Sequence, residues 1–204
     1  MCFKYQKMVK AYVEKKTKIC RKKQIVQYTV KFDNYTREVC KKMFTNYKNY
    51  VLLKQQINST YNVTTRSPNF PEDVSENIIK FILHDRGDST VVWKRRGDLY
   101  SEIEKKIECK SFISGGPTSF TPRSNWNIIY FLDARKWLTN HFVLYRCTLT
   151  RTSEDWKCIK VNKDQMFQDQ VDQKRRPRLD WEKLYPQIEP YCEVVFDGAL
   201  DFIE

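Results

Sequence analysis

The sequence lacks any long apolar run. No stretch of its 204 residues approaches the length of an uninterrupted apolar membrane span, which takes roughly 18 residues. The first residues carry several lysines and contain no apolar segment of the kind found in a secretory signal. We therefore expect an intracellular protein that is kept in a reducing compartment and has no membrane segment.

Histidine is scarce, and the cysteines form no recognisable motif. The chain has two histidines and seven cysteines, and no two cysteines are spaced as Cys-x-x-Cys. An odd number of widely spaced cysteines is atypical of a disulfide framework, and this set does not make a zinc site. Because 41% of the residues are hydrophobic and 14% aromatic, the chain can still bury a core. These features favour an ordinary globular domain.

Acidic residues are nearly absent from the first quarter of the chain. Residues 1–54 hold 15 Lys/Arg and 3 Asp/Glu, whereas the remaining 150 residues hold 22 of each, so the net charge of +12 arises in the first part. This asymmetry favours a polyanionic partner, either nucleic acid or an anionic membrane surface. A solvated lysine-rich face is the alternative.

The spacing of apolar residues predicts two basic amphipathic helices at residues 3–19 and 35–56, with a possible short strand at 28–32. Prolines in residues 64–73 indicate a linker. We therefore divide the chain into a basic helical N-terminal region, residues 1–63, and a core, residues 64–204.

The core alternates between strand and helix patterns. A helix capped by Asp73 or Ser75 should end at Gly87. Strands are predicted at 90–93, 97–101, 106–112, 127–132, 141–149, 156–161 and 191–196, with helices near 164–172 and 180–188. This order predicts an α/β fold with a central mixed β-sheet flanked by helices.

Residues 97–110 have the pattern of a hairpin whose turn is centred on Ile103. In that register, positions whose numbers sum to 206 face each other, so Asp98 and Glu108 are cross-strand neighbours. Direct neighbours have Cβ atoms about 4.5–5.5 Å apart. Lys110 lies two residues beyond Glu108 and points to the same face. Two carboxylates and an ammonium should therefore converge on one side of a sheet.

Two carboxylates this close repel each other unless a cation lies between them. Their hard oxygen atoms suit Mg²⁺, which could polarise a phosphate, while Lys110 orients or deprotonates the attacking water. In a chain with 30% charged residues, the same letters can arise by chance on a solvated hairpin. However, Ile107, Cys109 and Phe112 are predicted to face a core, which places the charged residues on a packed strand.

The hairpin resembles the PD-(D/E)xK nuclease signature of type II restriction endonucleases in the letters GDLY…IECKSF. The likeness is strengthened by SENIIKFIL before these letters and by GGPTSFTP…WNIIYFLDAR after them. The likeness covers residues 70–150 and extends to KRRPRLDWEKL, although Gly97-Asp98 replaces the family's Pro-Asp. It implies a restriction-endonuclease-like core that hydrolyses DNA phosphodiesters with Mg²⁺. Asp98 and Glu108 would hold the metal, and Asp98, Glu108 and Lys110 would be catalytic.

In this family a helix ahead of the hairpin often supplies a further carboxylate, and Glu76 is the matching position. The alternative interpretation of Glu76 is an acid favoured by the helix dipole in the first turn. Glu102 is the other candidate for the auxiliary acid.

Two segments could contact DNA. The loop 114–123 lacks the Gly-Lys-Ser/Thr end of a nucleotide-binding loop, which argues against ATP. Its hydroxyls and arginine suit phosphate or base contacts through Ser114, Thr118, Ser119 and Arg123. The second segment is a basic cluster of Lys174, Arg175, Arg176 and Arg178. A plain surface turn and a solvated loop are the respective alternatives.

The leading hypothesis is a Mg²⁺-dependent, sequence-specific endonuclease that cuts double-stranded DNA as a homodimer, because each chain has one such site. The alternatives are a repair, nicking or recombination nuclease of the same fold, and a non-catalytic basic DNA-binding protein. We expect the N-terminal basic segment to add sequence-independent affinity, unless Tyr47, Tyr50 and Val51 pack on the core or on a second subunit.

Overall fold

A computed structural model describes residues 35–65, 69–94, 98–116 and 125–203. The predicted helix at 3–19 and the possible strand at 28–32 lie outside these residues. Residues 35–204 form one structural unit. None of the described helices is both long and apolar enough to cross a membrane.

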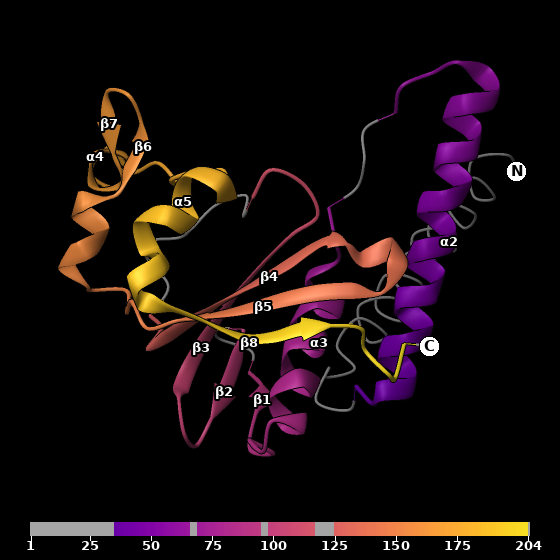
Figure 1. Cartoon of the computed structure of the whole chain (residues 1–204), viewed down its shortest axis with the longest axis horizontal. Helices are drawn as coiled ribbons and strands as arrows, with labels where there is room; N and C mark the ends of the chain where they lie inside the picture. Colours follow the sequence, from indigo (N-terminus) through magenta and orange to yellow (C-terminus); the bar gives the residue numbers. More distant parts are fainter. Residues whose placement is uncertain (1–34, 66–68, 95–97, 117–124, 204) are drawn as a thin grey trace, which may run out of the picture. The chain divides into compact units, whose positions relative to one another are not determined.

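The centre of the fold is a six-stranded mixed sheet (Figure 1). Its order is β1-β2-β3-β4-β5-β8, in which β3 and β4 are parallel and the other neighbours are antiparallel. The strands are β1 (Val92–Trp93), β2 (Leu99–Ser101), β3 (Lys105–Phe112), β4 (Ile128–Lys136), β5 (His141–Cys147) and β8 (Cys192–Gly198). This confirms the predicted α/β fold with a mixed sheet.

Strand β4 is buried on both sides of the sheet. Its alternate residues Ile128, Tyr130 and Leu132 belong to one core cluster, and Ile129 and Phe131 belong to the other. A strand covered on both faces needs apolar residues at every position, which explains the continuous apolar run rather than an alternating one.

Helices α2 (Arg37–Tyr61) and α3 (Glu72–Asp85) pack on the first cluster. Thr36 caps α2 by accepting a hydrogen bond from the amide of Val39. Cys40 and Phe44 of α2 are fully or nearly fully buried in that cluster. Tyr47 and Val51 pack against it, whereas Tyr50 remains 54% exposed. Part of the predicted basic helical region therefore contributes to the core.

Helix α3 begins earlier than predicted. Its first residue is Glu72, directly after Pro71, so Asp73 and Ser75 lie inside the helix rather than capping it. The hydroxyl of Ser75 donates to the carbonyl of Glu72, a bond within the first turn. The earlier start leaves Glu76 on the helix, where it can reach the sheet.

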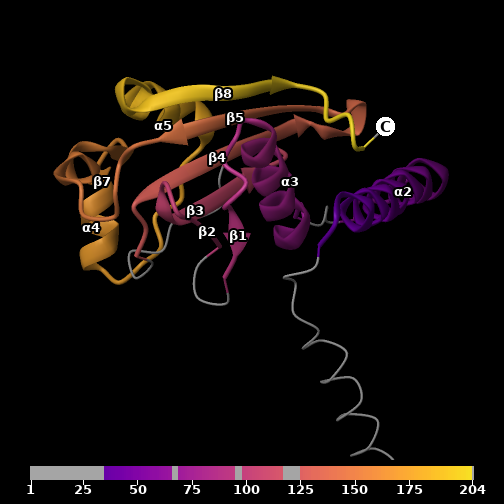
Figure 2. The same cartoon turned by 90° about the horizontal axis from the view of Figure 1, so that it is seen from below.

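Helix α5 (Trp181–Ile188) covers the second cluster. Beside it lie the 3₁₀ helix η3 (Glu154–Cys158), the short strands β6 (Lys160–Asn162) and β7 (Gln165–Met166), and helix α4 (Phe167–Asp172). Figure 1 and Figure 2 show these elements gathered at one end of the sheet and α2 at the other. The predicted strand 156–161 is wrong for its first half, because Trp156 lies in η3 with its indole donating to the carbonyl of Thr150. Residues 165–166, predicted as helix, form β7.

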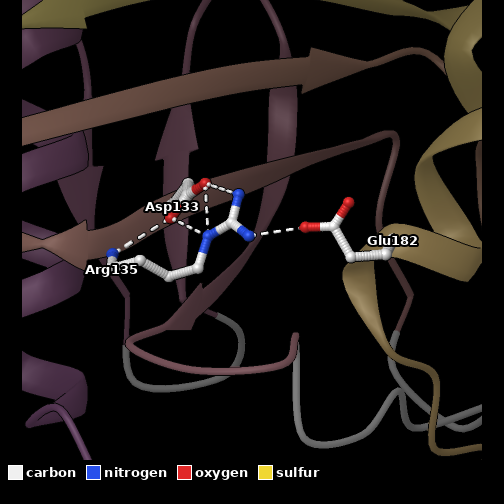
Figure 3. Close-up of polar contacts among 3 residues, drawn as sticks. All are labelled: Asp133, Arg135 and Glu182. Carbon is white, nitrogen blue, oxygen red and sulfur yellow. Dashed lines mark hydrogen bonds and ion pairs between the residues drawn. The ribbon is translucent and has the colours of Figure 1, made fainter.

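A surface ion-pair group connects β4 to α5 (Figure 3). The Arg135 guanidinium donates to Asp133 on its own strand and, at 2.6 Å, to Glu182 on α5. The pair with Glu182, whose side chain is 73% exposed, adds little stability.

Candidate active site

The hairpin has the register expected from its turn. Leu99 pairs with Ile107, and Ser101 pairs with Lys105, so the paired numbers sum to 206 as predicted. Asp98 lies directly before β2, at the position that continues this register toward Glu108. The turn therefore determines which carboxylates meet.

Alternation along β3 separates its charged side chains from its apolar ones. Ile107 and Cys109 belong to the first core cluster, under α3, as predicted. Phe112 was predicted to share that face, but it packs on Trp181 in the second cluster. The difference follows from strand geometry, because residues two apart share a face and Phe112 is four residues from Glu108.

Lys110 lies within ion-pair distance of both Asp98 and Glu108. The Lys110 Nζ atom is 2.7 Å from Glu108 Oε1 and 3.9 Å from Asp98 Oδ2. Asp98 Oδ2 also accepts a hydrogen bond of 2.7 Å from the amide of Cys109. The Glu108 side chain is 6% exposed, so this charge is held inside the protein. The sheet thus fixes the positions of all three groups.

Burial and charge shift the ionisation of these side chains. Burial raises the pKa of Asp98, while Lys110 and the amide of Cys109 partly offset the increase. Burial alone would lower the pKa of Lys110, but Glu108 and Asp98 outweigh it and raise that pKa. Burial, together with repulsion from Asp98, raises the pKa of Glu76 to about 8. The carboxylates are therefore crowded enough to favour a nearby cation.

A cavity of about 210 Å³ opens beside this group. Its lining includes Glu76, Asp98, Lys110, Ser114 and Arg176, which come from α3, the hairpin, the loop after β3 and the segment before α5. The cavity therefore brings together residues that lie far apart in the sequence.

Glu76 lies where the resemblance implied an auxiliary carboxylate. It lines the cavity, and its Oε2 accepts a 3.0 Å hydrogen bond from the Trp93 indole. Glu102, the other candidate, lies in the hairpin turn with its side chain 69% exposed and 3.6 Å from Lys105. The geometry favours Glu76 as the acid near the reacting groups. Sequence reasoning missed Trp93, since no pattern reveals the partner of an indole N–H.

The basic residues divide into two groups. Arg176 lines the cavity, whereas Lys174, Arg175 and Arg178 are exposed and do not line it. Ser114 lines the cavity as well. Thr118, Ser119 and Arg123 lie outside the described residues.

The donor set fits a hard divalent cation. Asp98 and Glu108 converge on one face and provide the carboxylate oxygens that Mg²⁺ prefers. Among the described residues, no three His, Cys, Asp or Glu side chains already stand together as a metal-binding group. The fit therefore rests on Asp98 and Glu108, with water and phosphate completing the coordination as is usual for Mg²⁺.

A mixed sheet whose hairpin presents Asp98, Glu108 and Lys110 beside a helix-borne carboxylate defines a restriction-endonuclease-like nuclease core. Residues 35–185 match the Bsp6I restriction endonuclease family. Over 151 residues, which are 72% of this chain and 84% of the relative, the sequence is 31% identical to the Type II restriction enzyme Bsp6I of Bacillus sp. (strain RFL6). No solved structure matches the chain.

The chain belongs to the Bsp6I restriction endonuclease family. It is accordingly a site-specific deoxyribonuclease whose substrate is DNA, and enzymes of this class generally need a divalent metal ion.

Proposed function

We propose that this enzyme hydrolyses phosphodiester bonds of double-stranded DNA at a specific sequence and uses Mg²⁺ to do so. The observation that carries the proposal is the contact of Lys110 Nζ with both Glu108 and Asp98 at the edge of a cavity. A buried carboxylate and a partly buried one beside a lysine provide a minimal set for metal-assisted attack on a phosphate. When bound, Mg²⁺ would supply Lewis acidity toward the scissile phosphate and the attacking water.

Each residue of the site has a separate task. Asp98 and Glu108 hold the metal, and the amide of Cys109 fixes the direction of the Asp98 carboxylate. Lys110 orients or deprotonates the attacking water and stabilises the charge that develops on the phosphate. Glu76, held by the Trp93 indole, is the auxiliary carboxylate from α3. Because the three main groups are fixed by the sheet, little reorganisation is needed during the reaction.

DNA contacts come from the loop after β3 and from the basic cluster before α5. In the loop, the residues that contact phosphates or bases next to the scissile bond are Ser114, Thr118, Ser119 and Arg123. The basic cluster neutralises phosphates or reads guanine in the major groove through Lys174, Arg175, Arg176 and Arg178. The arrangement is supported by the position of Ser114 and Arg176 on the cavity wall.

The active enzyme is a homodimer, since the described part of each chain has one such catalytic group and a double-strand cut needs two. Helix α2 offers a candidate surface for the second copy. One of its faces exposes apolar side chains at spacings of three and four residues, with exposed fractions of 41–71%: Tyr50, Leu53, Ile57 and Tyr61. Exposed apolar residues on one helix face are typical of helix–helix contacts.

Cleavage of supercoiled plasmid of known sequence tests the proposal. With Mg²⁺ we expect discrete linear fragments, no cleavage in EDTA, and binding without turnover in Ca²⁺. Glu108→Gln should bind DNA in Ca²⁺ but lose cleavage by at least about 10³-fold, the order expected when a catalytic group is removed. Sedimentation should give a mass near twice 24.7 kDa.

Other outcomes distinguish the alternatives. Nicks without linear product would indicate a nicking or repair enzyme, and binding without cleavage under any metal would indicate a DNA-binding protein. Activity that persists in EDTA would rule out the metal mechanism. Cleavage by Glu108→Gln at the wild-type rate would overturn the site assignment.

A further inference from the structure

The cavity beside the catalytic lysine has more acids than bases in its described lining. Glu72, Glu76 and Asp98 line it, and the only cations in its described lining are Lys110 and Arg176. Lys110 is already in contact with Glu108 and Asp98. A phosphate approaching these acids is repelled by those that are ionised unless further positive charge faces it. A bound metal would supply part of that charge, and a cation of the lining that is not already paired would supply more.

Arg176 is the residue placed to supply it. Its side chain is exposed and lines the cavity, and no carboxylate among the described residues pairs with it. This distinguishes it from Arg135, whose guanidinium is held by Asp133 and Glu182. An unpaired guanidinium can offer two parallel N–H groups to a phosphate, which makes it a better phosphate ligand than an occupied one.

The backbone that follows Arg176 is anchored. Pro177 and Leu179 are buried. Gly116, near the start of the loop after β3, lies so close to the carbonyl of Leu179 and the amide of Trp181 that no side chain would fit there. The amide of Trp181 also donates to the carbonyl of Gly115 at 2.6 Å. The segment carrying Arg176 is therefore held against the loop that follows the catalytic strand.

We propose that Arg176 binds the scissile phosphate in the catalytic cavity, opposite Asp98 and Lys110, while Arg178 contacts DNA only outside it. This role rests on the proposed nuclease function and adds to it a specific phosphate ligand. The guanidinium neutralises the phosphate as it approaches the acids, and it stabilises the additional negative charge of the transition state. No other basic residue of the cluster 174–178 lines the cavity.

Arg176→Gln and Arg178→Gln form a matched pair, because each removes one exposed positive charge from the same cluster. After the cut position has been mapped, single-turnover cleavage of a duplex containing it is measured with Mg²⁺ at saturating protein. We expect Arg176→Gln to lower the rate about 10²–10³-fold, the usual loss for one transition-state donor. Arg178→Gln should weaken binding, and it should lower the saturated rate far less than Arg176→Gln does, because Arg178 does not line the cavity. Arg176→Lys, which retains the charge without the fork of donors, should recover part of the rate.

A second measurement identifies the phosphate that Arg176 contacts. In Ca²⁺, replacing the scissile phosphate by an uncharged methylphosphonate should weaken binding more for wild type and Arg178→Gln than for Arg176→Gln. Equal losses in all three proteins, or equal cleavage rates for the two Gln variants, would overturn the role of Arg176 and leave the nuclease function intact. A wild-type protein that cuts no DNA with Mg²⁺ or Mn²⁺ would refute both.

Discussion

At the residue scale, the two candidates for the auxiliary acid differ in their surroundings: Glu76 lies at the cavity, and Glu102 lies in solvent. Glu76 lines the cavity with its Oε2 bonded to Trp93, whereas the Glu102 side chain is 69% exposed. We predict that Glu76→Gln lowers the single-turnover rate about 10–100-fold, the typical loss when a group supporting a metal site is removed. Glu102→Gln should cleave at the wild-type rate. The measurement is cleavage rate against Mg²⁺ concentration.

The conservative change keeps the shape of Glu76 and its contact with Trp93, so folding should be unaffected. Thermal melts of both variants check this. A rate loss confined to Glu102→Gln would transfer the auxiliary role to the hairpin turn. Equal rates for both variants would show that Glu76 has no auxiliary role in cleavage.

Predictions for single residues were confirmed where the position follows from strand register and from the two-residue period of side chains along a strand. The turn centre determined that Asp98 continues the register toward Glu108, and the two-residue period placed Lys110 on the same face as Glu108. The prediction for Phe112 was wrong because the same two-residue period places it on the face of Glu108, where it packs on Trp181. Trp93 was missed for another reason, because the tertiary contact of its indole leaves no local pattern.

At the element scale, Gly116 joins the end of the catalytic strand to the start of α5. A Cβ there would lie 2.2 Å from the amide nitrogen of Trp181. We predict that Gly116→Ala lowers stability by about 1–3 kcal/mol, the usual cost of overpacking. The melting temperature should fall by about 2–4 °C per kcal/mol in a chain of this size. Cleavage should fall as well, because the segment with Arg176 would move away from the cavity.

Gly87→Ala is the control for this prediction. Gly87 has a φ of 102°, and an added Cβ would meet no atom within 4 Å, so the substitution reports backbone strain without steric overlap. It follows α3 and does not line the cavity, so the variant should keep full cleavage activity. If Gly116→Ala is as stable and as active as wild type, the close contact with Trp181 does not hold the cavity together.

Elements with strong apolar periodicity were predicted well from the sequence, and irregular ones were not. The predicted strand at 127–132 became β4, because a strand buried on both faces has a continuous apolar signal. The segment 156–161 is also mostly apolar, but Trp156 is held in a 3₁₀ turn by its indole bond to Thr150. Short apolar runs do not distinguish these two structures.

At the scale of the whole molecule, helix α2 belongs both to the basic N-terminal part of the chain and to the core. Cys40 and Phe44 are buried against the sheet, so deleting residues 1–60 would remove part of the core. Residues 1–34 lie before this helix and hold ten Lys/Arg and two Asp/Glu, a net charge of +8. The charge can therefore be tested without removing α2.

Deleting residues 1–34 should weaken binding to all DNA and reduce its salt dependence, because each lost phosphate contact lowers the slope of log K against log salt by about 0.9. Cut positions should stay unchanged, since Ser114 and Arg176 remain. Circular dichroism first establishes that the truncated chain is folded, and affinity in Ca²⁺ is then measured from low to high salt. In the full-length chain, Gln at Lys15, Lys16, Lys22 and Lys23 should reproduce part of the slope change without any deletion. A folded truncation with an unchanged slope would contradict phosphate tracking by this segment, because its positive charge would then lie away from the DNA.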